Sequence, residues 1–73
     1  MSKEIIDGAI RQMVPLIAEH LKEALTIAET ASACAVAGNA DAALRVMMDI
    51  EESTTAAATL FNAAYILKRS RPE

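Results

Sequence analysis

The residues with the most evident chemical potential are His20 and Glu23, which stand three positions apart. On a helix this spacing places both side chains on one face, where an imidazole and a carboxylate can share a proton or bind a metal ion. His20 is the only histidine, so further metal ligands would have to come from another chain. The plainer interpretation is a histidine at the edge of an apolar stripe, held by a glutamate. We therefore predict no metal site and no cofactor.

Cys34 is the only cysteine, and as a nucleophile it would need a base close by. His20 lies 14 residues away, about 21 Å along a helix that rises about 1.5 Å per residue. We interpret Cys34 as a small buried apolar residue in a reducing, cytoplasmic compartment. The sequence also lacks a glycine-rich phosphate loop and a Cys-x-x-Cys pair, so we predict a protein that is not an enzyme.

The segment Glu19-His20-Leu21-Lys22-Glu23-Ala24-Leu25-Thr26 resembles the phospho-acceptor box of histidine-kinase dimerisation domains, typically His-Glu-Leu-Arg-Thr-Pro-Leu-Thr. Those domains are two-helix hairpins that dimerise into four-helix bundles, and the resemblance implies a phosphotransfer role for His20. The His-Glu order is inverted here, so Glu19 stands at the family's histidine position, and Ala24 replaces the proline. Phosphotransfer is therefore an alternative function.

The charge balance disfavours nucleic acid as a partner, because the net charge is −3 and phosphate binding needs concentrated positive charge. Lys68, Arg69 and Arg71 form a small basic end, which leaves an RNA- or DNA-binding modulator as a second alternative. The longest uncharged run, 53–67, is shorter than the ~20 apolar residues of a membrane span. The first residues lead straight into an amphipathic pattern with acids, so we expect neither a membrane segment nor a signal peptide.

The elements that position these residues are two long helices around the turn formed by Gly38, Asn39 and Asp41. Gly38 can adopt the left-handed conformation that ends a helix, and Asn39 or Asp41 can cap the next one. Apolar residues recur every three or four positions on both sides. We predict one domain, 1–73, with a helix at about 3–37, a turn at 38–40 and a helix at about 41–69.

Two places could interrupt these helices. Pro15 removes a backbone hydrogen bond and clashes with the carbonyl of Arg11, so the first helix is expected to be kinked there, or broken. The second helix keeps its apolar phase across Ser53-Thr54-Thr55, which favours one continuous helix. The alternative is a break at that point, and the Gly38-Asn39 turn would then resemble the turn inside a tetratricopeptide repeat.

Pairing the helices through the turn predicts the residues between them. Small residues face larger ones in this predicted hairpin seam, which comprises Ile17, Leu21, Ala28, Cys34, Leu44, Ile50, Ala57 and Phe61. Leu21→Asp and Leu60→Asp should each unfold the protein, because either charge would enter apolar contacts without a partner. Further apolar residues of the second helix fall outside the seam and predict an interface between chains at Met48, Ala56, Leu60, Ala63 and Ile66.

The composition indicates why such an interface is needed. Of the 73 residues 53% are hydrophobic, but 16 are alanine and only two are aromatic, so a single hairpin would have a thin core. Domains of this size often need oligomerisation, metals or disulfides to be stable, and only the first is available here. We predict an all-α antiparallel hairpin that forms a homodimeric four-helix bundle. Its expected function is a small protein-interaction or regulatory module, with another protein as a possible further partner.

Overall fold

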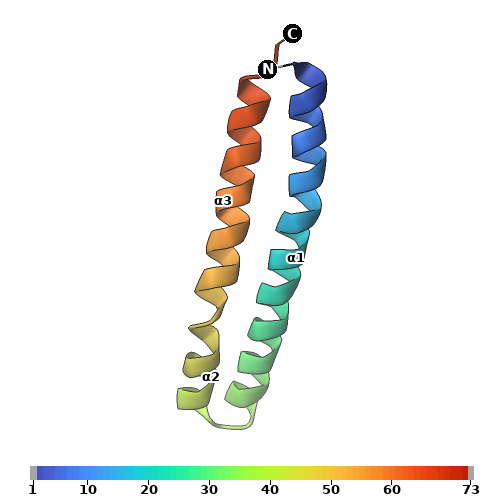
Figure 1. The fold of residues 1–73 in the computed structure, drawn as a ribbon. Coiled ribbons are helices and arrows are strands. Elements are labelled where there is room, and N and C mark those ends of the chain that lie inside the picture. The colour runs from blue at the N-terminus through green and yellow to red at the C-terminus, as the bar shows by residue number, and fades with distance from the viewer. Residues whose placement is uncertain (1, 73) are drawn as a thin grey trace.

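The computed structural model describes residues 2–72, so Met1 and Glu73 of the predicted domain lie outside the described residues. Within that range the chain is all-helical and forms a hairpin (Figure 1). One arm is α1, Lys3–Val36, and the other consists of α2, Ala40–Met47, and α3, Ile50–Arg69. The predicted all-α helical hairpin is confirmed.

Helix α1 begins at a serine cap and passes through its proline without a break. The side chain of Ser2 accepts a hydrogen bond from the backbone N–H of Ile5 at 3.3 Å, which satisfies one of the free N–H groups of the first turn. Pro15 lies inside the helix and is exposed to solvent. Of the two alternatives that the sequence left open, a continuous helix or a break at Pro15, the structure has the continuous helix.

The turn between the arms is a Schellman motif centred on Gly38. Its φ is +85°, in the left-handed region that favours glycine. The N–H of Gly38 donates to the carbonyl of Ala35, and that of Asn39 donates to the carbonyl of Cys34, both at 3.0 Å. Asn39 then caps α2 by accepting from the N–H of Ala42 at 3.0 Å, and Asp41 lies in the first helical turn. One short connection thus ends one helix and begins the next.

The second arm is interrupted at Met48 and Asp49, whereas the sequence predicted one continuous helix. Met48 still donates to the carbonyl of Leu44, but Asp49 donates to the carbonyl of Val46, three residues back instead of four. Both residues keep helical backbone angles, so the arm tightens locally and continues in the same direction (Figure 1). Helix α3 then runs unbroken through Ser53-Thr54-Thr55.

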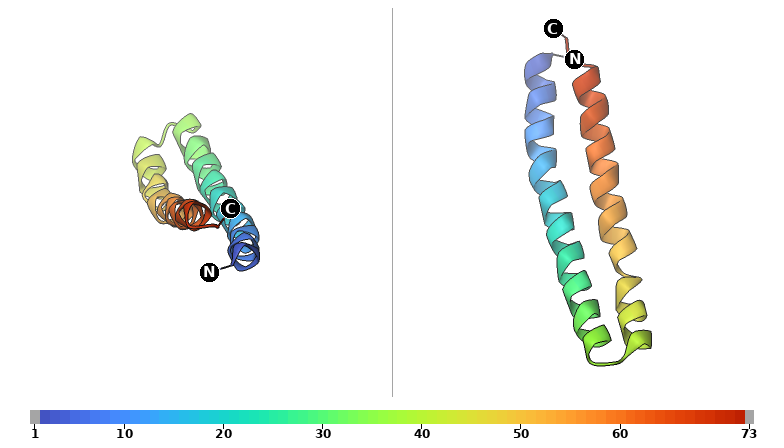
Figure 2. Two further views of the ribbon diagram at one scale, coloured as in Figure 1. Left: turned by 90° about the horizontal axis from the view of Figure 1, so that it is seen from above. Right: turned by 180° about the vertical axis from the view of Figure 1, so that it is seen from behind.

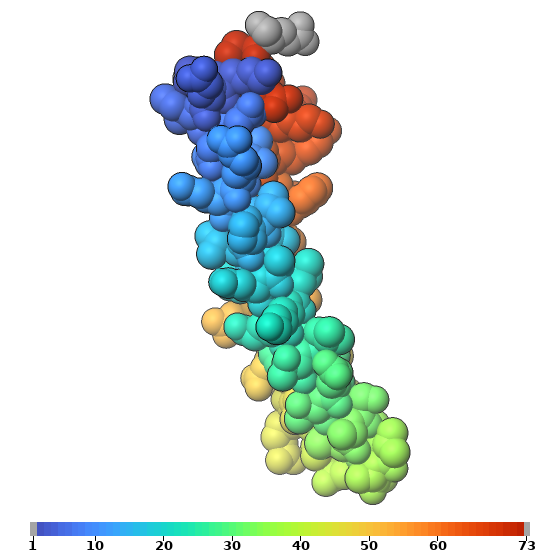
Figure 3. Space-filling view, turned by 90° about the vertical axis from the view of Figure 1, so that its right-hand side faces the viewer, coloured from blue at the N-terminus to red at the C-terminus, as the bar shows by residue number. Residues whose placement is uncertain are grey.

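The space between the arms is filled mainly by small side chains. The buried residues are Ile6, Ala24, Ala31, Ser53, Ala57 and Ala64. The least exposed positions of each arm recur with alternating steps of three and four, the pattern of helices that wrap around one another. Figure 3 agrees, because the second arm emerges on one side of α1 near the chain ends and on the other side near the turn.

The molecule is a narrow rod (Figure 2) with principal extents of 55 × 14 × 13 Å. Its radius of gyration is 16.8 Å, compared with about 11 Å for a compact domain of this length. A rod of two helices has only one internal contact surface, so much of each helix faces outward. Within residues 2–72, no helix combines the length and apolar character needed to cross a membrane.

Candidate functional site

At several positions the residue that lies in the hairpin seam is the chain neighbour of the one predicted from the sequence. Leu21, Leu44 and Phe61 are 51%, 69% and 60% exposed, so their placement between the arms was wrong. Their chain neighbours His20, Ala43 and Leu60 are better covered and occupy the seam positions of the three-four pattern. The remaining predicted members are buried or half-buried: Ile17, Ala28, Cys34, Ile50 and Ala57.

The physical reason for the shift is the size of the residues that face one another. Ala24 and Ser53 are both buried, and they are equally distant along the chain from the Gly38–Asn39 peptide bond. Small residues at this level let the helices approach closely, while the larger Leu21 and Phe61 fit better on the flank of the seam. A shift of one residue turns a helix by about 100°, which is enough to move a side chain from the seam to the surface.

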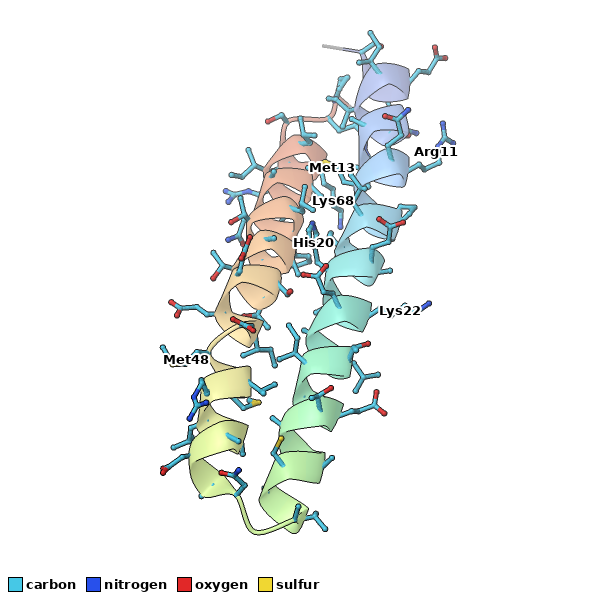
Figure 4. The ribbon with its side chains drawn as sticks, turned by 60° about the horizontal axis from the view of Figure 1, so that its bottom comes forward. Arg11, Met13, His20, Lys22, Met48 and Lys68 are labelled. Atoms are coloured by element: carbon cyan, nitrogen blue, oxygen red, sulfur yellow. The ribbon has the colours of Figure 1, made fainter. Side chains whose placement is uncertain are left out.

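His20 and Glu23 do not form a pair. Ser53 is 1% exposed, and its hydroxyl donates a 2.6 Å hydrogen bond to Oε1 of Glu23, which ties α1 to α3. His20 is half-buried and lies toward the space between the arms (Figure 4). Among residues 2–72 no group of three His, Cys, Asp or Glu side chains is placed to hold a metal ion. Glu23 therefore acts as a contact between helices, in an arrangement that sequence spacing alone did not reveal.

Cys34 is a free, half-buried thiol on the last turn of α1. Its backbone carbonyl accepts the hydrogen bond from Asn39 that closes the turn. The residue is thus part of the structure that ends α1. Its place on the seam side of the helix agrees with its interpretation as a small apolar residue.

The basic end of the chain is largely engaged within the molecule. Nη1 of Arg71 donates to Oδ1 of Asp7 at 2.7 Å, which joins the two ends of the chain. This hydrogen bond is the main reason that the pKa of Asp7 is lowered; burial opposes it, and the positive charges of Arg71, Lys3 and Arg11 add to the lowering. The guanidinium of Arg69 lies over the ring of Tyr65 at 6.0 Å. These contacts leave little concentrated positive charge for phosphate binding.

One face of the rod carries two apolar grooves, each lined by both arms. The terminal groove, near the chain ends, is formed mainly by Ile10, Val14, Ile17, Phe61, Ala64 and Tyr65. The turn groove, near the Schellman motif, is formed mainly by Ala28, Ala31, Ala35, Ala43, Leu44 and Met47. Nearly every member of one groove lies 14 or 21 residues from a member of the other groove on the same arm, as Val14 and Ala28 do, so both grooves lie on one face.

We call this surface the apolar face. Its large exposed side chains are Val14, Leu21, Leu25, Leu44, Met47, Phe61 and Tyr65. Along α1 it continues as an uncharged stripe with steps of three and four: Val14, Ala18, Leu21, Leu25, Ala28, Ser32 and Ala35. Because the stripe contains three alanines and a serine, it is easily read as part of a single wide seam. The signal that identifies it as a second stripe is that none of its seven members, from Val14 to Ala35, is charged.

The residues predicted to form an interface between chains do not share one surface. Leu60 belongs to the seam, and Ala56 and Ala63 are half-buried on its other flank. Met48 points away from α1 at the interruption of the second arm (Figure 4). Met48 is 75% exposed and Ile66 is 61% exposed. Exposed apolar side chains do occur on the second arm, and those at Leu44, Met47, Phe61 and Tyr65 belong to the apolar face, which both arms build.

Lys22 and Arg11 point away from the second arm (Figure 4), so the charged residues of α1 lie largely outside the seam. The apolar face and the charged outer surface are therefore distinct sides of the same helix. Comparison with known proteins gave no match to a protein-family model, a curated protein or a solved structure.

Proposed function

We propose that the protein is a small, non-enzymatic interaction module that works as a self-associated helical bundle, with a homodimer as its basic unit. The observation that supports this most strongly is the exposed surface of one hairpin, 5516 Å². A compact monomer of 7.8 kDa exposes about 4,400 Å² according to the relation between surface and mass. One hairpin thus exposes about 1,100 Å² more than a compact chain of its mass.

A second copy offers a direct way to cover this surplus. Covering about 1,100 Å² on each of two hairpins buries about 2,200 Å² in total, which falls in the range of permanent dimers. Two hairpins packed side by side form a four-helix bundle, in which each helix gains a second neighbour. The proposal includes a bend of α1 at Pro15, where the missing backbone hydrogen bond lets the helix follow a partner's curvature.

The other two functions have weaker support. A phospho-accepting histidine must be reached by a phosphate donor, whereas His20 is half-buried toward the seam. A nucleic-acid surface needs several free cations, whereas Arg71 is paired with Asp7 and Arg69 lies against Tyr65. The free-thiol state of Cys34 is compatible with action in the cytoplasm, which we include in the proposal.

Analytical ultracentrifugation tests the proposal. Sedimentation equilibrium of the full chain at low micromolar concentration should give twice the 7.8 kDa mass of one chain. Circular dichroism on the same samples should show a helical protein. A helical species that keeps the mass of one chain up to hundreds of micromolar would refute self-association. A mass other than one or two chains would refute the homodimer as the basic unit.

A further inference from the structure

The positions of the few charges on the apolar face can indicate how a partner is oriented on it. By its spacing of seven residues from Leu44 and fourteen from Tyr65, Glu51 falls on the stripe of α3 nearest the apolar face, in the first turn of that helix. Its side chain also borders a shallow hollow on the outer side of the second arm, together with Met48, Glu52, Thr55 and Ala56. Lys68 lines the terminal groove at the other end of α3. Seventeen residues, about 25 Å of helix, separate the two, so they cannot pair within one chain.

We propose that the occupant of the apolar face is a second copy of this chain in antiparallel orientation, with the two turns at opposite ends of the bundle. This inference rests on the proposed function and specifies its geometry. In this arrangement the two-fold axis crosses the rod at right angles, so α3 packs on α3 and α1 packs on α1. Glu51 of each copy then lies beside Lys68 of the other, which forms two equivalent ion pairs.

The apolar residues of both arms give the same centre of symmetry. On α3 the two-fold axis passes midway between Glu51 and Lys68. Two further pairs on the same stripe have this same midpoint, namely Thr54 with Tyr65 and Ala58 with Phe61. Thr54 therefore meets Tyr65 of the other copy, and Ala58 meets Phe61. A small residue faces an aromatic one in each contact, which allows the rings to be accommodated without separating the helices.

Helix α1 has its own centre at the same level of the rod. The bond between Glu23 and Ser53 and the ion pair between Asp7 and Arg71 fix which parts of the two arms lie side by side. In this alignment of the two arms, the midpoint of the α3 pairs lies beside the part of α1 between Ile17 and Ala18. Val14 and Leu21 are equidistant from this same point, so each meets the other across the axis. Ala18 lies at the crossing, where a small side chain permits close approach.

The parallel arrangement lacks these complementary contacts. With both turns at one end, α3 of one copy packs on α1 of the other at the same level. Glu51 then lies opposite Leu25 on the uncharged stripe of α1, and the nearest cation, Lys22, points away from the second arm (Figure 4). A carboxylate placed against apolar surface without a partner is costly, so the charges favour the antiparallel dimer.

A charge exchange tests the ion pairs. Glu51→Lys and Lys68→Glu should each weaken the dimer about tenfold, because each puts two like-charge contacts in the interface. Both changes also oppose the dipole of α3, so without contact between copies their effects would add in the double variant. The antiparallel dimer instead predicts that the double variant regains most of the lost affinity.

The matched control is the pair Glu52→Lys and Arg69→Glu, which has the same spacing and dipole positions; Glu52 lies off the stripe, and Arg69 contacts Tyr65 of its own chain. Its double variant should show the sum of the two single effects. Rescue by this control pair, or no rescue by the Glu51 and Lys68 pair, would overturn the proposed ion pairs while leaving a dimer possible by other contacts.

Distance measurement tests the orientation independently. Val36 is 86% exposed at the end of α1, and Val36→Cys in a Cys34→Ser background provides one spin-label site per chain. Antiparallel packing about the inferred centre predicts labels about 55 Å apart. A separation below about 40 Å would indicate the parallel arrangement, since packed helices lie about 8–10 Å apart, and would overturn this inference. Absence of any dipolar coupling together with the mass of one chain would instead refute self-association itself.

Discussion

At the scale of single residues, the sequence placed the seam to within one position of where the structure has it. The three-four recurrence identified Ile17, Ile50 and Ala57 as inward-facing. It placed Phe61 in the seam and Leu60 in the interface between chains, whereas Leu60 is the better covered of the two. Close approach at Ala24 and Ser53 decides the matter, and that depends on how both helices pack.

The small size of the seam residues can be tested at Ala24. Ala24→Leu should lower the free energy of unfolding by about 1–3 kcal/mol, because added methylene groups cannot be accommodated between closely packed helices. Ala33→Leu is the matched control, since Ala33 lies on the same helix but is exposed. Urea unfolding followed by circular dichroism measures both. Equal stability of the two variants would show that the arms do not approach closely at Ala24.

The ion pair between Asp7 and Arg71 predicts a dependence on pH. Because the folded pKa of Asp7 is lowered, its contribution to stability is present above the ordinary carboxyl pKa and is lost as the pH falls through the folded value. Asp7→Asn should therefore unfold at a slightly lower temperature than the parent at pH 7, and at the same temperature near pH 2.

The control for this titration is Glu29→Gln, an exposed acid on α1 that is remote from the chain ends. Its difference from the parent should change little between the two pH values. If the difference for Asp7→Asn persisted undiminished at low pH, the ion pair would not be its cause.

At the scale of the elements, local signals predicted the helices well. The capping residues Ser2 and Asn39 and the left-handed Gly38 lie where their chemistry indicated. The interruption at Met48 and Asp49 was missed because neither residue is a strong helix breaker. No residue type in the sequence marks this interruption, which is seen only in the backbone hydrogen bonds of the structure.

The two glycines allow the same substitution to be made in opposite contexts. Gly38→Ala should destabilise the protein by about 1–2 kcal/mol, because φ is +85° and a side chain is strained there even though no atom obstructs it. Gly8→Ala should stabilise it by about 0.5–1 kcal/mol, because Gly8 is helical and its added methyl group also meets open space. Thermal unfolding measures both. Changes of the same sign would contradict the Schellman turn.

At the scale of the whole molecule, the sequence indicated surplus apolar surface but located only part of it. It drew attention to the second arm, where charges are absent from 53–67. The apolar face takes residues from both arms, as Leu25 and Phe61 illustrate, and their proximity depends on the register of the hairpin. A pattern read along one helix cannot supply that register.

A pair of charge insertions distinguishes the seam from the apolar face. Leu60→Asp puts a carboxylate between the arms and should abolish helicity at every chain concentration. Leu21→Asp, which the sequence alone placed in the seam, should retain helicity and shift the association equilibrium towards monomer, since Leu21 is half exposed. Circular dichroism and sedimentation separate these effects. Equal unfolding by both substitutions would return Leu21 to the seam.

We propose that the thin core of one hairpin is stabilised when another copy covers its apolar face. The most direct measurement is the thermal unfolding midpoint of the unmodified chain as its concentration is raised a hundredfold, followed by circular dichroism. Association that stabilises the folded state makes the midpoint rise with chain concentration. We predict that rise, and a midpoint that stays constant over the whole range would contradict the claim.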